Sequence, residues 1–278
     1  MTLDPILSRY HQIQTRPITL DDRISSIPQK IFTESPLVDR TKQIFQAVQG
    51  VYEAIYDDPE LQPKDPYILR TDRYHYQEVW GRVKELKPDH SIALAVAAML
   101  HDIERYLEKH QEPPLSGDAD THIRKKVFHP LNSARIAMEL LKSAPLSDQE
   151  KEDIQYLIER HDANLEEIKY NESILLEGVS PDHRLYPDLV TLIKADAMAF
   201  FNSSVFDFIA DYKWTSPDKE LVRRVRLCYD KLNDPSQQVA VSRQLFQKKG
   251  SFHDIPEKHN RIKIILTDAG ILMSLDVL

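Results

Sequence analysis

The chain has 278 residues, 41% of them hydrophobic, which is enough for one large domain or for one domain with extensions. Its formal net charge of −8 gives no basic footprint for nucleic acid. Its single cysteine, Cys228, excludes an internal disulfide and a thiolate metal cluster, and it fits a reducing compartment.

The first half of the chain changes from weak to strong patterning. Residues 1–35 are polar, punctuated by proline and weakly patterned, so we expect an arm or cap there. Residues 36–56 follow a helical repeat, and the proline-rich segment 57–66 predicts a break. The apolar positions on one side of this predicted helix are Ile44, Phe45, Val48, Val51, Tyr52 and Ile55.

From residue 67 to about residue 210 the pattern predicts a run of helices. Pro130 suits the first turn of one helix and places His129 near its N-cap. Ser147 and Glu150 form a capping-box motif, S-x-x-E, which predicts another helix that reaches about His161. The polar segment 117–130 predicts a flexible connection.

Three further segments follow in chain order. Leu189, Leu192, Ile193 and Phe200 predict a helix that runs through Asp196. Residues 218–248 again follow a helical pattern. The C-terminal stretch RIKIILTDAGIL fits a strand or a helix.

We therefore predict an all-α fold with an N-terminal arm and helix in residues 1–66, a core in residues 67–215, and a C-terminal extension of the same domain in residues 216–278.

Several motifs are missing from the sequence. Glycine is scarce, with six residues, and neither GxGxxG nor GxxxxGK[ST] occurs. Dinucleotide folds and P-loops need such glycines for close approach to phosphate, so the sequence argues against both. The N-terminal stretch lacks the layout of a signal peptide, and no apolar run approaches the ~18 residues of a membrane span. We expect a cytoplasmic protein with no membrane partner.

Polar side chains interrupt apolar faces at four positions. Residues 93–100 (ALAVAAML) carry no polar side chain, and His101 and Asp102 follow directly. His161 and Asp196 also stand where an apolar helical stripe would continue. An ionised carboxylate is buried only when it is paired or bound to a metal. Histidines and aspartates on the inner faces of three helices therefore suggest a shared partner.

Two more imidazoles complete the candidate set of metal ligands: His75, His101, Asp102, His129, His161 and Asp196. Successive members lie about one helix and its connection apart, so neighbouring helices of a bundle could each present a ligand to one interior point. His122, in the same predicted connection, is the rival of His129. Imidazole and carboxylate ligands suit iron, manganese, zinc, nickel or cobalt, and the lack of thiolates disfavours a closed structural zinc site.

This arrangement resembles the H…HD…H…H…D pattern of the HD-domain superfamily, which consists mostly of metal-dependent phosphohydrolases with an all-helical core. The resemblance covers roughly residues 70–205. It implies that His75, His101, Asp102 and Asp196 hold one metal, and that Asp102 bridges to a second metal held by His129 and His161. The chain also contains His161–Asp162 and His253–Asp254, of which the second has no apolar helix before it; Asp162 is expected at the surface or behind the ligands.

The chain departs from the family after the doublet. Many members continue as HDxGK, with a lysine that contacts substrate, whereas this chain reads HDIER. Arg105 takes the lysine position and could grip a phosphate in a bidentate way. Glu104 replaces the glycine and could order a water or pair with a nearby base. We assign catalytic roles to Asp102 and Glu104 and substrate binding to Arg105 and Lys125.

The resemblance makes a phosphohydrolase the leading hypothesis, acting on a small phosphorylated substrate such as a nucleotide, with water activated by two divalent transition metals. The same ligand pattern is similar to the di-iron site of inositol oxygenase and its phosphonate-cleaving relatives, so an oxygenase is the first alternative. A non-catalytic sensor or scaffold that keeps the metal core for stability is the second. Long helices outside the core could support a homodimer.

Overall fold

The computed structural model describes residues 4–34, 39–64, 68, 73–111, 128–162, 179–201, 203–211, 219–232, 234–247 and 255–271. Every regular element in these ranges is helical, which confirms the all-α fold class. The α-helices are α1 (Asp4–Thr15), α2 (Asp22–Glu34), α3 (Arg40–Asp57), α5 (His75–Leu86), α6 (Ile92–Leu100), α8 (His129–Leu140), α9 (Asp148–Arg160), α11 (Tyr186–Phe200), α12 (Ser203–Asp211), α13 (Lys219–Asp230), α14 (Pro235–Gln247) and α15 (Pro256–Asp268). Two short 3₁₀ turns, η1 (Ile103–Tyr106) and η2 (Glu108–His110), follow α6.

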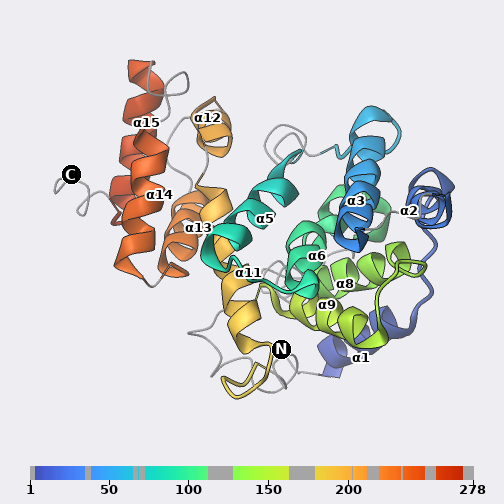
Figure 1. Ribbon diagram of the computed structural model, residues 1–278. Helices are drawn as coiled ribbons and strands as arrows, with labels where there is room; N and C mark the ends of the chain where they lie inside the picture. The colour runs from blue at the N-terminus through green and yellow to red at the C-terminus, as the bar shows by residue number, and fades with distance from the viewer. Residues whose placement is uncertain are drawn as a thin grey trace.

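Helix α6 lies at the centre of the core, where it contacts α3, α5, α8, α9 and α11 (Figure 1). The side chains of residues 93–100 are all buried. Ser91 begins the helix, because its Oγ accepts a hydrogen bond from the backbone N–H of Leu94 at 3.1 Å. A helix that is apolar all round has to be covered on every side. Its end therefore delivers His101 and Asp102 into the interior.

The N-terminal segment is more regular than the weak pattern of residues 1–35 suggests, because α1 and α2 lie within it. Helix α2 packs against α3 at a point where Gly50 allows close approach. A Cβ atom at Gly50 would lie 2.9 Å from Cγ2 of Ile27, so a larger residue would force the two helices apart. These helices therefore cover one side of the core instead of extending from it.

The helix predicted over residues 36–56 is α3. It begins at Arg40 because the side chain of Asp39 accepts a hydrogen bond from the backbone N–H of Lys42 at 3.1 Å. Five of the six expected inner positions are buried, and Phe45 is partly buried, with its ring 4.2 Å from that of Trp80. The apolar stripe read from the sequence is thus the face that packs on the core.

The capping box of α9 is present as predicted. Ser147 Oγ accepts from the backbone N–H of Glu150 at 3.2 Å, and Glu150 Oε2 accepts from the backbone N–H of Ser147 at 2.8 Å. The helix ends at Arg160, with His161 at the C-cap. His129 is the first residue of α8, next to the N-cap residue Phe128, as its place before Pro130 predicts. The helix predicted through Asp196 is α11.

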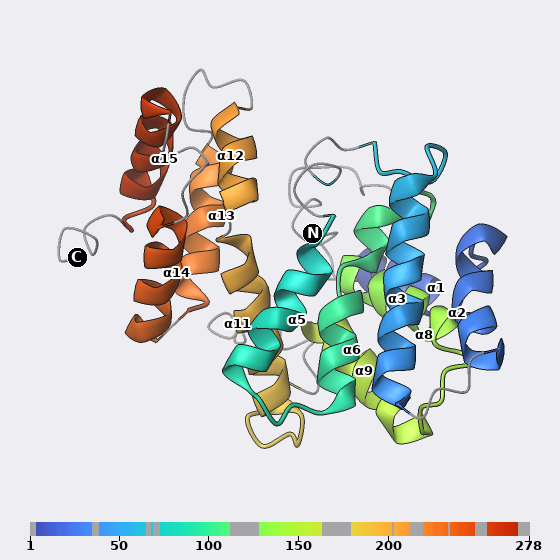
Figure 2. The same cartoon turned by 45° about the horizontal axis from the view of Figure 1, so that its top comes forward.

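In the described residues after α12 there are three separate helices. The segment 218–248 contains two helices, α13 and α14, instead of one, and the C-terminal stretch that fitted a strand or a helix contributes to α15. Two clusters of buried apolar residues meet within α11: Ala195 and Ala199 belong to the core cluster, whereas Ala197 and Phe200 belong to the C-terminal cluster. Figure 2 shows α12–α15 on one side of the core and α1–α3 on the other. The domain boundaries at residues 66 and 215 stay predictions.

No helix in the described part of the chain has both the length and the apolar character that crossing a bilayer requires. The cytoplasmic location stays an expectation. The predicted flexible connection, residues 117–130, lies outside the described residues except at its end, where Phe128 precedes α8.

Candidate metal centre

Asp102 lies at the middle of a buried cluster of imidazole and carboxylate groups. It follows the C-cap residue of α6, and its side chain is 10% exposed. Oδ1 faces Nε2 of His129 at 2.9 Å and Nε2 of His161 at 3.5 Å. Oδ2 faces Nε2 of His75 and Nε2 of His101, both at 3.8 Å. The two oxygens of one carboxylate therefore address two different pairs of histidines.

The ends of α6 and α9 orient two of these histidines in the same way. His101 is the C-cap of α6, and its Nδ1 donates to the carbonyl of Ala98 at 2.9 Å. His161 is the C-cap of α9, and its Nδ1 donates to the carbonyl of Ile158 at 2.7 Å. A carbonyl oxygen only accepts, so Nδ1 carries the proton and the lone pair of the neutral ring lies on Nε2. Each helix thus uses a carbonyl of its last turn to aim a histidine at Asp102.

Glu104 orients the third histidine. It is 3% exposed, and its Oε2 accepts a hydrogen bond from Nδ1 of His129 at 2.7 Å. The backbone N–H of Glu104 donates to Ser133 Oγ at 3.3 Å, which ties η1 to α8. Burial lowers the pKa of His129, but its hydrogen bonds with Asp102 and Glu104 outweigh burial and raise the pKa to about 10. Of the two expected roles of Glu104, the structure shows the pairing with a base.

The packing of α5 against α11 brings His75 and Asp196 together, although they are far apart in the sequence (Figure 2). His75, the first residue of α5, places Nε2 3.1 Å from Oδ1 of Asp196. The same oxygen lies 3.5 Å from Nε2 of His101. Burial raises the pKa of Asp196, but the nearby His101 and His75 outweigh burial and hold it well below its usual range. Asp196 therefore points inward, as its position in the stripe of α11 predicts.

Arg105 contacts the cluster from its edge. The 3₁₀ turn η1 places residues i and i+3 in line, so Nη1 of Arg105 reaches Oδ2 of Asp102 at 2.5 Å. The side chain of Arg105 is 22% exposed. Burial raises the pKa of Asp102, but Arg105 and the facing histidines lower it well below its usual range. The carboxylate of Asp102 is thus ionised. The guanidinium of Arg105 pairs with it at the edge of the cluster, where the arginine side chain is partly exposed to solvent.

Lys231 is a charged group near this site that the sequence did not suggest. It follows α13, and its Nζ lies 3.9 Å from Oδ1 of Asp162, whose Oδ2 is 3.8 Å from Nε2 of His161. Burial lowers the pKa of Lys231, but Asp162 and Asp196 outweigh burial and raise it. Asp162 thus lies beside His161, on the Nε2 side that also faces Asp102, and 23% of its side chain is exposed. The residue directly after α13 thus contributes a positive charge here.

The donor atoms are close enough together that they could hold a metal ion. One donor atom from each of His75, His101 and Asp102 lies within 4.8 Å of the other two, and the same holds for Asp102, His129 and His161. Nε2 of His101 is fully buried and has no hydrogen-bond partner within the described ranges. A buried nitrogen without a partner costs free energy, and a bound cation would remove that cost. Nitrogen and oxygen donors without sulfur suit divalent transition metals.

The structure brings all six predicted ligands to one place, together with Glu104 and Arg105. Lys125 and the rival His122 lie outside the described residues, as do His253 and Asp254. The sequence missed Lys231 because its neighbourhood carries no ligand-like motif, and only the packing of α13 on α11 brings it near the cluster.

Comparisons of the chain with models of protein families, with curated proteins and with solved structures found no match. The arrangement of the side chains is therefore what supports a functional interpretation.

Proposed function

We propose that this protein is a metal-dependent phosphohydrolase of the HD type, which cleaves a phosphate ester of a small molecule. The observation that carries the proposal is the bridging position of Asp102, whose two oxygens face separate pairs of histidines. Such a carboxylate is suited to joining two metal ions about 3.5–4 Å apart, the arrangement common in hydrolases of phosphate esters. A structural metal site would need only one such set of donors.

The residues around Asp102 would divide into two sets of ligands. His75, His101 and Asp196 lie on the Oδ2 side, and His129 and His161 lie on the Oδ1 side. When bound, the two ions would supply Lewis acidity to the phosphoryl oxygens and an acidic water as the nucleophile.

The chain's own cations suit an anionic substrate. The guanidinium of Arg105 has five N–H donors in a planar fork, which matches two oxygens of a phosphate. It lies at the edge of the cluster, where 22% of the side chain is exposed, so it is within reach of a group that enters from solvent. Lys231 offsets the charge of Asp162. We assign substrate binding to Arg105 and the positioning of His129 to Glu104.

The first test is the metal content of the purified protein, followed by turnover of a panel of phosphate monoesters and diesters with added manganese, iron, nickel or cobalt. We expect close to two ions per chain and hydrolysis under anaerobic conditions. The Asp102→Asn protein should lose at least one ion and its activity, because the amide lacks the negative charge that both sets share.

The matched control is Asp188→Asn, a buried aspartate that contacts Lys87 and Ser91, outside the cluster. This variant should keep its metal even if its stability falls. Metal-loaded wild-type protein that hydrolysed no ester in the panel would contradict the phosphohydrolase proposal. Bound iron with substrate-dependent consumption of O2 would favour the oxygenase instead.

A further inference from the structure

Lys231 lies beside the metal cluster, although it follows α13, a helix of the C-terminal part of the chain that packs against α11 (Figure 2). Its backbone N–H donates to the carbonyl of Leu227 at 3.1 Å, and the backbone N–H of Leu232 donates to the carbonyl of Tyr229 at 3.0 Å. Leu232 is fully buried in the C-terminal apolar cluster. Hydrogen bonds and apolar packing therefore hold the end of α13, and Lys231 stands at a defined place.

The ammonium group of Lys231 has a charged neighbour but, within the described residues, no hydrogen bond. Nζ lies 3.9 Å from Oδ1 of Asp162, which is beyond hydrogen-bond distance, and only 15% of the side chain is exposed. Burial lowers the pKa of Lys231, but Asp162 and Asp196 outweigh burial and raise it, so the group is positively charged. A largely buried cation without a hydrogen-bond acceptor costs free energy, and an anion that reached it would offset that cost.

Lys231 belongs to the part of the cluster that solvent reaches. The more exposed side chains at the cluster, at 15–23%, are those of Arg105, Asp162, Asp196 and Lys231. The side chains of the other described members of the cluster are 10% exposed or less. A molecule that enters from solvent therefore meets two carboxylates and two cations before it meets the buried histidines.

The charges around the cluster suit an anion once metal is bound. The described carboxylates there are those of Asp102, Glu104, Asp162 and Asp196. The described permanent cations are Arg105 and Lys231. With two divalent ions bound, these groups together carry an excess of positive charge, and a phosphate group would bring the negative charge that offsets it.

We propose that Lys231 binds the phosphoryl group of the substrate at the metal cluster. This inference rests on the proposed function, because it takes a phosphate ester as the substrate. In the chain of contacts from Nζ of Lys231 to Nε2 of His161, the carboxylate of Asp162 alone stands between them, with gaps of 3.9 and 3.8 Å. The oxygens of one phosphate group can meet a metal ion on one side and an ammonium group on another. A phosphate held on the His161 side of the cluster is therefore within reach of Lys231.

The experiment is calorimetric titration of the manganese-loaded full-length protein with inorganic phosphate. Lys231→Met should bind phosphate at least about tenfold more weakly than wild type, since a charge-assisted bond to phosphate contributes about that factor. Lys231→Arg should bind more tightly than Lys231→Met, because it restores the charge, and both variants should keep their manganese.

Four results of this titration would overturn the proposal. The first is wild-type protein that binds no phosphate, and the second is equal affinity in wild type and Lys231→Met. The third is a Lys231→Arg protein that binds as weakly as Lys231→Met, because charge would then not be what matters. The fourth is loss of manganese from Lys231→Met, because Lys231 would then support the metal and not the substrate.

A second pair of variants separates binding of phosphate from simple neutralisation of Asp162. Asp162→Asn removes the partner of Lys231, and Asp162→Asn/Lys231→Met removes both charges. The double variant leaves no carboxylate without its cation, so it avoids the main reason why Lys231→Met could fail to fold. It should bind phosphate about tenfold more weakly than Asp162→Asn. Equal affinity would show that Lys231 only balances Asp162, which would overturn the proposal.

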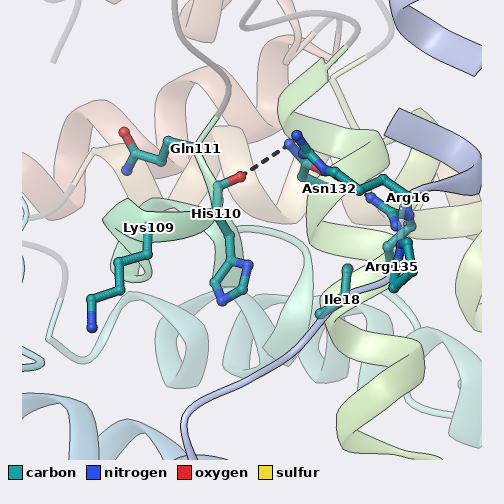
Figure 3. A pocket seen from close by; sticks show the side chains of 8 residues that line it. Arg16, Ile18, Lys109, His110, Gln111, Asn132 and Arg135 are labelled. Carbon is teal, nitrogen blue, oxygen red and sulfur yellow. Dashed lines mark hydrogen bonds between the residues drawn. The ribbon is translucent and has the colours of Figure 1, made fainter. Parts of the chain in front are cut away.

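Two control variants test whether the effect belongs to this place. Lys87→Met removes a partly buried lysine that pairs with Asp188 outside the cluster, so it matches the loss of an ion pair. Lys109→Met removes a charge from another basic region, a pocket of about 360 Å³ that Arg16 and Arg135 also line (Figure 3). Both controls should bind phosphate as wild type does. A loss in either control equal to that of Lys231→Met would overturn the proposal.

Turnover of esters distinguishes the failure of this proposal from the failure of the proposed function. Hydrolysis of esters together with a phosphate affinity that does not depend on Lys231 would overturn the role of Lys231 and leave the phosphohydrolase in place. Phosphate binding that depends on Lys231 without hydrolysis of any ester would contradict the phosphohydrolase and leave anion binding by Lys231 supported.

Discussion

Glu104 determines which nitrogen of His129 faces Asp102. Its carboxylate accepts the Nδ1 proton at 2.7 Å, so Nε2 is left to face Asp102. Carboxylates behind a metal-bound histidine fix the ring and raise its basicity. The sequence left this role open between ordering a water and pairing with a base, because the partner comes from α8 and only the tertiary fold brings it within reach.

The Glu104→Gln variant should therefore bind metal about 10–100-fold more weakly while it stays folded. The amide oxygen still accepts the Nδ1 proton, but it lacks the charge that makes the imidazole a stronger ligand. Competition with a coloured chelator measures the affinity. Glu139→Gln, an exposed glutamate on the same helix α8, is the control and should bind metal normally. If the two variants had equal affinity, Glu104 would have no positioning role.

Single residues also show where prediction from sequence ends. His161 and Asp196 could be predicted as inward-facing because each continues an apolar stripe on its own helix. Lys231 could not, since its place beside Asp162 depends on how α13 packs against α11. Periodicity reports the faces of one helix, and contacts between distant helices leave no such trace.

At the level of the helix, the end of α6 depends on a tyrosine from α3. The hydroxyl of Tyr52 donates to the carbonyl of Met99 at 2.8 Å, and the ring is 2% exposed. Carbonyls of the last turn have no partner within the helix and need one elsewhere. His101 satisfies Ala98 in the same turn through Nδ1. The helix therefore ends with the carbonyls of Ala98 and Met99 paired, directly before His101 and Asp102.

The Tyr52→Phe variant should lose about 1–3 kcal/mol of unfolding free energy, because it leaves the carbonyl of Met99 without this buried donor. Urea denaturation measures the loss. Tyr74→Phe, at a residue that is 58% exposed, is the control and should change stability by less than about 0.5 kcal/mol. A Tyr52→Phe protein as stable as the control would mean that the Met99 carbonyl finds another partner.

The capping box of α9 makes part of the stability depend on pH. Burial raises the pKa of Glu150, but hydrogen bonds from Ser147 and the charge of Arg40 outweigh burial and lower the pKa below 4.5. Because the folded pKa is lowered, the ionised carboxylate stabilises the fold above pH 4.5, and this contribution is lost as the pH falls through the folded pKa.

The difference in unfolding free energy between wild type and Glu150→Gln should therefore be largest near neutral pH and shrink in acid. Urea denaturation at a series of pH values measures it, provided that both proteins remain folded at the lowest pH. Gln149→Glu, at a neighbouring exposed position, is the control for adding or removing a charge near the start of the helix. A difference that stayed constant with pH would show that the charge of Glu150 does not act through the cap.

Helix boundaries were less predictable than helix faces. The segment 218–248 breaks before α14 because Pro235 has no N–H to donate back to the carbonyl of Lys231. In α15 the sequence was ambiguous because Ile262 and Ile264 alternate as in a strand. The structure buries Ile262 and leaves Ile264 45% exposed, which selects the helix. Packing against the neighbouring helices decides such cases.

For the molecule as a whole, the cluster joins five parts of the chain. His75 starts α5, His129 starts α8, Asp196 lies within α11, and residues 101 and 161 end α6 and α9. A cation bound by these residues is lost when the chain unfolds, because the unfolded chain does not hold the ligands together. Metal binding should therefore stabilise the entire core.

We expect the protein loaded with a divalent transition metal to unfold at a temperature about 5–10 °C above that of chelator-treated protein. At a free metal concentration 100-fold above Kd the gain is about 2.7 kcal/mol, and each kcal/mol corresponds to roughly 2–4 °C in a chain of this size. Differential scanning calorimetry measures both states. The Asp102→Asn protein should lose most of this shift, because both sets of ligands share that carboxylate. The Asp188→Asn protein should unfold at a lower temperature than wild type without metal, but metal should raise its unfolding temperature by the full amount. Equal shifts in the two variants would mean that the metal binds elsewhere and that Asp102 does not bridge.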